Sequence, residues 1–365
     1  MKKLSSILLL TAATILSSCG GSKPIYEQGD SKTIKGTGSL FHETVGFNTK
    51  DASIFEEDGT RYIVYASNEV SKGNQVFAAR KATLSSDGTW VYGKKNIVLR
   101  GDEESWDVYI YNPSIIKGEF KYEGTTYSYL MSYNGNDNKN NTNNHIGLAV
   151  TNNILGKWTK VGDEPILENP EIYEASYGFG GSSLVSFDNK GKGYIFYTVG
   201  DTDVTYQAAR SYDFSDLDNI VLDKGYSSIP VTGLSDKADV NIISNASFAI
   251  SSDKSTLYIV RDRLPASGNK PGQTTEVEVA KASVNILGSL SESWTNIDFI
   301  SGKDTMDVED ENSLGWDQIY SGDFVTNPYG VITSSTSVDV VYSTFDEESL
   351  DASYTASLAM YTVTL

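Results

Sequence analysis

The chain is short of thiols, imidazoles and prolines. It contains one cysteine, two histidines and eight prolines among 365 residues. A single thiol excludes an intrachain disulfide and a cysteine-rich metal site. The only imidazoles are His42 and His145, so we expect no zinc site, and we expect His145 at the surface. The fold must therefore be stabilised without disulfide or zinc cross-links.

Positive charge is scarce as well. The sequence has 29 lysines and arginines against 48 aspartates and glutamates, which gives a formal net charge of −19. Binding to nucleic acid needs clustered Lys and Arg, so this balance argues against a nucleic-acid partner. It also argues against most polyanionic substrates, unless a local basic pocket overrides the global sign.

The N-terminus has the pattern of an export signal. Lys2 and Lys3 precede an apolar run, residues 4–16, which is too short to cross a bilayer as a permanent helix. The run ends in Leu16-Ser-Ser-Cys19, which resembles a bacterial lipobox; the alternative is an ordinary signal peptide with an incidental cysteine. Without Lys2 and Lys3 the formal charge falls from −19 to about −21.

The lipobox resemblance implies a signal peptide over residues 1–18 and lipidation of Cys19. Residues 19–38 are polar and turn-rich, as a tether between lipid and domain should be. The protein is then expected in the cell envelope, attached through its lipid to a membrane. That membrane could be the outer membrane, with the domain periplasmic or exposed at the cell surface.

One pattern occurs five times in the rest of the chain. Each copy begins with a short apolar strand, followed by a turn, a Tyr-rich second strand and a third strand with a repeated alanine. The equivalent positions in the first strands are Asp51, Asn112, Gly181, Asn245 and Asn327. The repeated alanines are Ala79, Ala149, Ala209, Ala280 and Ala359. Three copies continue to an outer-strand tryptophan, Trp90, Trp158 or Trp294, which we expect to be structural.

The repeat predicts an all-β fold, a five-bladed β-propeller with about four antiparallel strands per blade. A β-sandwich is the alternative, but it has no reason to repeat this order five times. The propeller should occupy residues 39–365, with blades near 51–97, 106–166, 177–228, 239–298 and 317–365. The last copy stops at Leu365 after its third strand, so residues 33–47 are expected to supply the missing outer strand.

In a propeller the first strands line the central channel, so their equivalent residues should converge at one mouth. A concave site with polar groups from several blades is a usual place for a small ligand. Trp106-Asp107 and Trp316-Asp317 precede two of these strands. Their indoles could stack on a sugar ring while the carboxylates accept its hydroxyls. The alternative is that both pairs serve packing and turn hydrogen bonds. Tyr177 is a less specific candidate of the same kind.

In this pattern the chain resembles the five-bladed glycoside hydrolases of family 43 and their relatives. The resemblance is carried by residues 51–62 (DASIFEEDGTRY), 112–116 (NPSII) and 146–159 (IGLAVTNNILGKWT). It implies that Asp51 is a general base, which activates water for inverting attack at an anomeric carbon. The other two carboxylates of the family correspond here to Gly181 and Ser244.

An inverting hydrolase needs a second carboxyl group, roughly 6.5–9.5 Å from the first. A loop would have to supply it, and the choices are Glu171, Glu174, Asp107, Asp239, Asp317 and Asp323. The candidate catalytic residues are Asp51, Glu174 and Asp323. The candidate substrate-binding residues are Trp106, Asp107, Asn112, Tyr177, Asn245, Trp316, Asp317 and Asn327.

Two functions follow from these observations. The first is a glycoside hydrolase-like lipoprotein that acts on oligosaccharide or polysaccharide fragments. The second is a non-catalytic glycan-binding surface lipoprotein that has lost carboxylates at Gly181 and Ser244. A propeller that binds a protein partner has no specific support. Both functions predict a carbohydrate ligand and no cofactor. The many carboxylates could hold Ca²⁺ on the axis, but no loop has a suitable ligand spacing.

Overall fold

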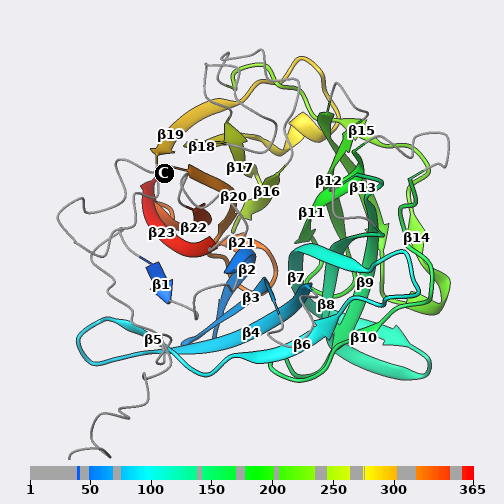
Figure 1. The fold of residues 1–365 in the computed structure, drawn as a ribbon. Coiled ribbons are helices and arrows are strands. Elements are labelled where there is room, and N and C mark those ends of the chain that lie inside the picture. The colour runs from blue at the N-terminus through cyan, green and yellow to red at the C-terminus, as the bar shows by residue number, and fades with distance from the viewer. Residues whose placement is uncertain are drawn as a thin grey trace, which may run out of the picture.

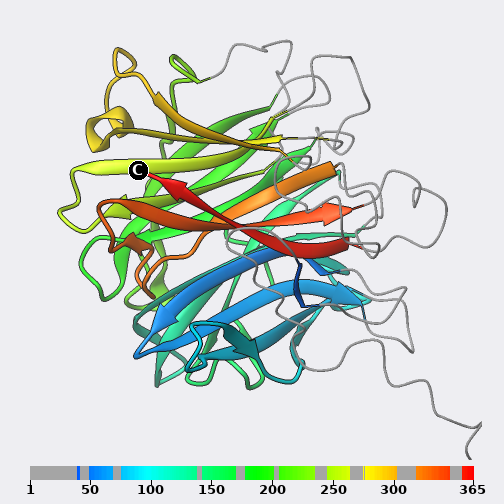
Figure 2. The same ribbon diagram turned by 90° about the vertical axis from the view of Figure 1, so that its left-hand side faces the viewer.

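The computed structural model describes residues 39–41, 49–68, 75–137, 142–169, 177–200, 205–234, 245–263, 274, 276–301, 318–345 and 356–365. They form five sheets around a central axis (Figure 1), which confirms the predicted all-β, five-bladed propeller. Seen from the side, the strands cross the thickness of the ring (Figure 2). In the described ranges, no helix is long and apolar enough to span a membrane.

Each blade is built outward from an inner strand. Blade one contains β2 (Thr49–Glu57), β3 (Thr60–Asn68), β4 (Gln75–Leu84), β5 (Trp90–Tyr92) and β6 (Asn96–Arg100). Blade two contains β7 (Tyr109–Tyr122), β8 (Thr125–Asn136), β9 (His145–Thr151) and β10 (Thr159–Lys160). Blade three contains β11 (Gly178–Ser186), β12 (Lys192–Gly200), β13 (Thr205–Asp213), β14 (Val221–Leu222) and β15 (Ser227–Ser228).

The last two blades have additional strands from elsewhere in the chain. Blade four contains β16 (Ala246–Ser251), β17 (Thr256–Arg263), β18 (Glu276–Ser283) and β19 (Thr295–Ser301), with β21 (Val331–Ile332) parallel to β16. Blade five contains β20 (Gln318–Phe324), β22 (Ser337–Phe345), β23 (Ala356–Thr364) and β1 (Ser39–Phe41). The N-terminal strand therefore closes the ring as predicted, because Ser39 pairs with Ala359 on β23.

The turns and the core follow from the repeated sequence. Asp58-Gly59 and Glu123-Gly124 join first to second strands with positive φ at both residues, as two-residue hairpin turns require. The five repeated alanines lie on the third strands and are at most 2% exposed. Buried apolar side chains form clusters between neighbouring blades, so the core lies between the sheets rather than on the axis.

A belt of hydrogen bonds links the inner strands around the axis. Its residues occupy the same place in every blade and are Ser53, Ser114, Ser183, Ser247 and Asp323. In four blades the belt side chain accepts a backbone N–H from the next inner strand. These bonds run from Ile115 to Ser53 (3.2 Å), Leu184 to Ser114 (2.9 Å), Phe248 to Ser183 (3.0 Å) and Ile54 to Asp323 (3.3 Å). Ser247 donates directly to Asp323, which completes the circle.

A plug closes one end of the channel. Backbone carbonyls of residues 326–330 accept an N–H from each of the first four inner strands. These bonds are Glu56 to Thr326 (2.8 Å), Lys117 to Pro328 (2.6 Å), Ser186 to Tyr329 (3.1 Å) and Ile250 to Gly330 (3.0 Å). The plug satisfies one N–H at the same depth in four blades, and any axial site must open at the opposite end.

The ring closure makes a direct prediction about Leu40. This side chain on β1 is 1% exposed and packs in the cluster between blades five and one. Leu40→Ala should lower the free energy of unfolding by about 2–5 kcal/mol, because it removes buried methyl groups and leaves a cavity. Denaturant unfolding measures this loss. Leu84→Ala is the control, since Leu84 on β4 is 54% exposed; equal effects of the two changes would contradict the closure.

Candidate functional site

The candidate site lies on the axis, at the end where the inner strands begin. Its floor is formed by one residue from each blade, and these floor residues are Asp51, Asn112, Gly181, Asn245 and Ser321. Four of them have positive φ, between 47° and 55°. Each of these four lies in a β-bulge of its inner strand. A bulge redirects side chains, and here it brings the floor residues to the axis.

The floor residues are joined across the axis by hydrogen bonds. The Asn112 amide donates to Asn245 Oδ1 at 3.1 Å and to Ser321 Oγ at 3.2 Å. Asn112 Oδ1 accepts from the Asn134 amide at 3.2 Å. Between floor and belt lies a cavity of 30 Å³, which is room for about one or two water molecules. A sugar must therefore lie above the floor rather than within the channel.

The structure brings together Asp51, Asn112, Asn245 and Asp323 of the predicted site. The prediction that Asn327 is the blade-five equivalent of Asp51 is wrong. Asn327 lies in the plug at the far end, where its side chain accepts backbone N–H groups of Tyr329 (2.9 Å) and Val331 (3.2 Å). Ser321 holds the equivalent position instead, with φ of 51° in the bulge of β20.

Asp51 is 4% exposed and lies in the part of blade one that faces the axis. Its Oδ2 is 3.5 Å from the Lys50 ammonium, which also lies 4.8 Å from the centre of the Tyr111 ring. No described residue donates a hydrogen bond to the Asp51 carboxylate. Burial, followed by the charge of Asp51, raises the pKa of Tyr111 well above its usual value. Tyr111 therefore remains a hydrogen-bond donor beside Asp51.

Asp262 is a site residue that the sequence reasoning missed. It is 4% exposed at the end of β17, where its Oδ1 accepts from Ser321 N at 2.6 Å and its Oδ2 accepts from the Asn245 amide at 2.7 Å. Burial, followed by the charges of Asp262 and Asp51, raises the pKa of Tyr177. The available signal was Arg261-Asp262-Arg263 at the end of an apolar strand.

Asp323 is held in the belt rather than above the floor. Its Oδ1 accepts from Ser247 Oγ and from its neighbour Phe324 N (3.0 Å), and its Oδ2 accepts from Ile54 N (3.3 Å). Burial raises the pKa of Asp323 to about 7, although these hydrogen bonds oppose the shift. The four equivalent belt residues are serines, so the position is used for structure in every blade.

Trp106 and Asp107 do not line the central cavity. The Trp106 indole stacks on Tyr133, with ring centroids 5.8 Å apart, and donates to Asp163 O at 3.1 Å. Asp107 is fully buried and accepts from the Tyr133 hydroxyl at 2.9 Å. The packing alternative therefore describes their part in the fold. The surface expectation for His145 is wrong: this residue is 8% exposed and its Nδ1 accepts from Asn169 N at 3.0 Å.

Several predicted residues lie outside the described residues. They are Cys19, His42, Glu171, Glu174, Asp239, Ser244, Trp316 and Asp317. Among the described residues, no group of three or more His, Cys, Asp or Glu side chains is placed to hold a metal ion.

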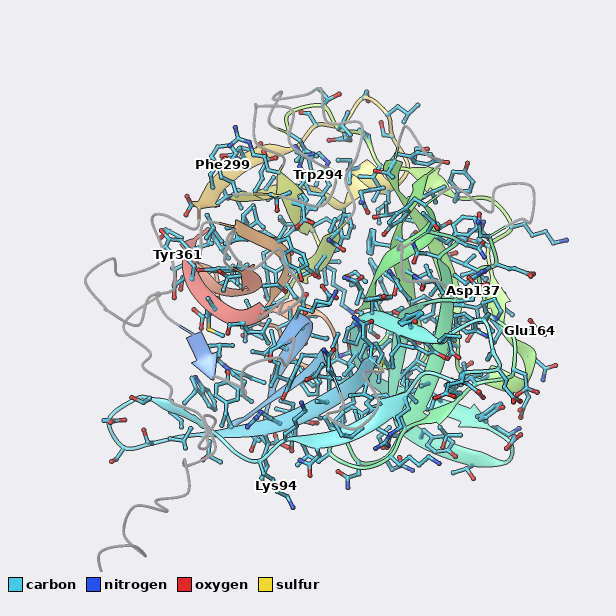
Figure 3. All side chains as sticks on the ribbon, in the orientation of Figure 1. Lys94, Asp137, Glu164, Trp294, Phe299 and Tyr361 are labelled. Carbon is cyan, nitrogen blue, oxygen red and sulfur yellow. The ribbon has the colours of Figure 1, made fainter. Side chains whose placement is uncertain are left out.

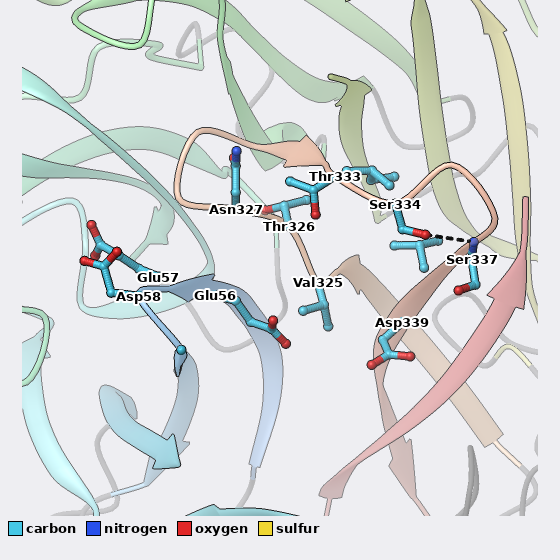
Figure 4. Close-up of a pocket in the computed structure, with 13 residues that line it drawn as sticks. Glu56, Glu57, Asp58, Val325, Thr326, Asn327, Thr333, Ser334, Ser337 and Asp339 are labelled. Carbon is cyan, nitrogen blue, oxygen red and sulfur yellow. Dashed lines mark hydrogen bonds between the residues drawn. The ribbon is translucent and has the colours of Figure 1, made fainter. Parts of the chain in front are cut away.

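A second cavity, of 360 Å³, lies beside the plug (Figure 4). Its wall includes Glu56, Glu57 and Asp339. Arg61 forms ion pairs with Glu56 (2.5 Å) and Asp339 (3.2 Å), and Lys117 pairs with Glu57. These carboxylates are thus occupied by basic residues of blades one and two, and they bind the plugged end together.

At the level of sequence, no protein-family model and no curated protein matches the chain. Solved structures do. A thermostable family-43 glycoside hydrolase has a TM-score of 0.53 at 13% identity, over 86% of this chain and 89% of its own. A GH62 hydrolase in complex with xylotriose has a TM-score of 0.58 at 10% identity, over 93% of this chain and 100% of its own.

The catalytic domain of the Coprinopsis cinerea GH62 α-L-arabinofuranosidase also has a TM-score of 0.58, at 10% identity, over 94% of this chain and 98% of its own. The chain has the five-bladed propeller fold of these glycoside hydrolases. At such identities the likeness concerns the fold, and the chemistry must be argued from the residues of this chain.

The belt predicts that stability depends on the protonation of Asp323. Because its folded-state pKa is raised from 3.8 to about 7, the group stabilises the fold below pH 4 and loses this contribution as pH rises through 7. The loss is about 4 kcal/mol at most. Asp323→Ser, which restores the residue of the other four blades, should remove this dependence. Denaturant unfolding from pH 4.5 to 8 tests it, and parallel curves for variant and parent would contradict it.

Proposed function

We propose that the protein is a glycoside hydrolase that acts on oligosaccharide or polysaccharide fragments, with Asp51 as the general base of an inverting mechanism. The observation that carries this proposal is the contrast among three axial carboxylates. Asp262 and Asp323 both have their oxygens occupied by N–H or O–H donors. The Asp51 carboxylate accepts no hydrogen bond from a described residue and forms its one ion pair among them with Lys50, so it can accept a proton from water.

The surroundings of Asp51 suit this role. Lys50 contacts Oδ2 of the carboxylate, which leaves Oδ1 for the attacking water. Tyr111 and Tyr177 keep their protons because burial and nearby carboxylates raise their pKa values. They can donate to sugar hydroxyls above the floor. Since the plug closes the other end of the channel, substrate and water arrive from the same side.

The general acid must come from another carboxyl group. Both oxygens of Asp262 accept from nitrogen donors, so they are occupied in holding Ser321 and Asn245 and are poorly placed to donate a proton to a substrate. We propose Glu174, which precedes Tyr177 by three positions in the chain, as the acid that protonates the leaving oxygen. The fold likeness to a hydrolase that holds xylotriose supports a short neutral oligosaccharide as ligand.

A second candidate function is glycan binding without catalysis. It is favoured by Gly181 at the floor position where the resemblance places an aspartate, and by the engagement of Asp262 in hydrogen bonds. The same floor would then orient a sugar without cleaving it. For both functions we propose attachment to the cell envelope through lipidated Cys19 and the tether of residues 19–38.

Substitution of Asp51 separates the two functions. With residues 20–365, a panel of aryl glycosides and neutral oligosaccharides should be hydrolysed, and Asp51→Asn should lower kcat by about 10²–10⁴-fold, the usual contribution of a general base. Asp58→Asn is a matched control. Asp58 also has a positive φ, 49° against 51° for Asp51, but lies on an exposed turn at the other end of β2. Saturable binding without turnover in all three proteins would instead support the glycan-binding function.

A further inference from the structure

Blade two contains a cavity that the proposed function does not use. Its volume is 610 Å³, and none of its described lining residues also lines the 30 Å³ axial cavity. Trp106, Asp107, Tyr133 and Lys160 form its inner wall, with acidic residues around them. Glu164, one of these acidic residues, lies at the outer margin of the ring (Figure 3). The cavity therefore reaches the outer margin of the ring and is separate from the axial cavity.

The aromatic part of the wall is rigid. Trp106 stacks on Tyr133 at an interplanar angle of 15°, and its indole N–H is bound by Asp163 O. Two glycines lie close to the indole: a Cβ at Gly135 would be 2.3 Å from it and a Cβ at Gly147 would be 2.5 Å from it. The neighbouring strands thus lack side chains where the indole packs. The partly exposed ring is held in place before any ligand arrives.

The polar part of the wall contains an unsatisfied acceptor. The Asp107 side chain is 1% exposed, and its Oδ2 contacts the Tyr133 hydroxyl and the Lys160 ammonium, the latter at 2.5 Å. Its Oδ1 has no hydrogen-bond partner among the described residues. A buried acceptor without a partner costs about 1–3 kcal/mol, so a donor from a bound water or ligand would stabilise this part of the wall.

Charge restricts the chemistry of a ligand here. Four acidic residues of the cavity wall are exposed, namely Asp102, Glu104, Asp163 and Glu164. Among the described residues that line the cavity, Lys160 is the one basic side chain, and Asp107 already pairs with it. An anionic ligand would be repelled, whereas a neutral polyol could donate hydroxyls to the carboxylates and accept a hydrogen bond from Lys160.

We propose that this cavity is a second saccharide-binding site for a neutral sugar unit. The sugar ring lies against the Trp106 indole, and its hydroxyls bind the Lys160 ammonium and the exposed carboxylates. One part of an oligosaccharide would bind in this cavity, on the side of the propeller. Another part of the same oligosaccharide would lie on the axial floor. The inference does not depend on catalysis, since no residue of the axial site takes part.

Titration calorimetry on residues 20–365 with Asp51→Asn, using xylotriose as the probe, tests the site. Adding Lys160→Met, which keeps the aliphatic stem and removes the donor, should weaken the affinity of one binding site at least fivefold. Lys192→Met is the matched control, since Lys192 forms a 3.0 Å ion pair with Asp213 on blade three. Trp106→Phe should reduce the same binding and the accompanying change in tryptophan fluorescence.

The outcomes distinguish this proposal from the proposed function. Binding that is lost with Lys160→Met, while turnover of small aryl glycosides by the chain with Asp51 is unchanged, supports a separate site. Xylotriose binding that is indifferent to both Lys160→Met and Trp106→Phe would overturn it, as would no binding at all. Tighter binding of trigalacturonate than of xylotriose would overturn the assignment to a neutral sugar.

Discussion

Hydrogen bonding between inner strands around the axis is the constraint on which the rest of the structure depends. Each inner strand contributes at three depths: a floor residue, a belt residue two positions later and, in the first four blades, an N–H donated to the plug five positions later. The core lies between blades. The polar groups that face the axis must therefore find hydrogen-bond partners there. The repeated serine accepts a backbone N–H and occupies little volume.

Three carboxylates near the axis have different roles because they have different hydrogen-bond partners. Asp323 takes the place of a belt serine and joins blades four and one. Asp262 holds the backbone of Ser321 and the amide of Asn245, and so fixes the floor. The Asp51 carboxylate, at the open end, pairs with Lys50 and accepts no hydrogen bond from a described residue. Asp51 is thus proposed as the base because no described residue donates a hydrogen bond to its carboxylate. Burial and a raised pKa alone would have favoured Asp323 as the catalytic carboxyl group.

Much of the fold could be predicted from the sequence because the pattern of one blade occurs five times along the chain. Several features follow from requirements of the local structure and can be recognised in the sequence. They are the repeated alanines, the turns at Asp58-Gly59 and Glu123-Gly124, and the missing last strand. The fifth repeat was misplaced because Thr326-Asn-Pro-Tyr resembles Tyr111-Asn-Pro-Ser. The former forms the plug, while Tyr320-Ser-Gly-Asp323 makes the bulge. Roles that depend on partners far away in the chain, as for Asp323, His145 and Trp106, leave no local sequence pattern from which they could be predicted.

The account depends most on Asp51 acting as a base toward water at the open end of the axis. Proton NMR of the first product formed from an oligosaccharide, recorded before mutarotation, tests this directly. Attack by a water that Asp51 activates predicts an anomeric configuration opposite to that of the substrate. Retention of configuration, or no product from any neutral oligosaccharide tested, would contradict it.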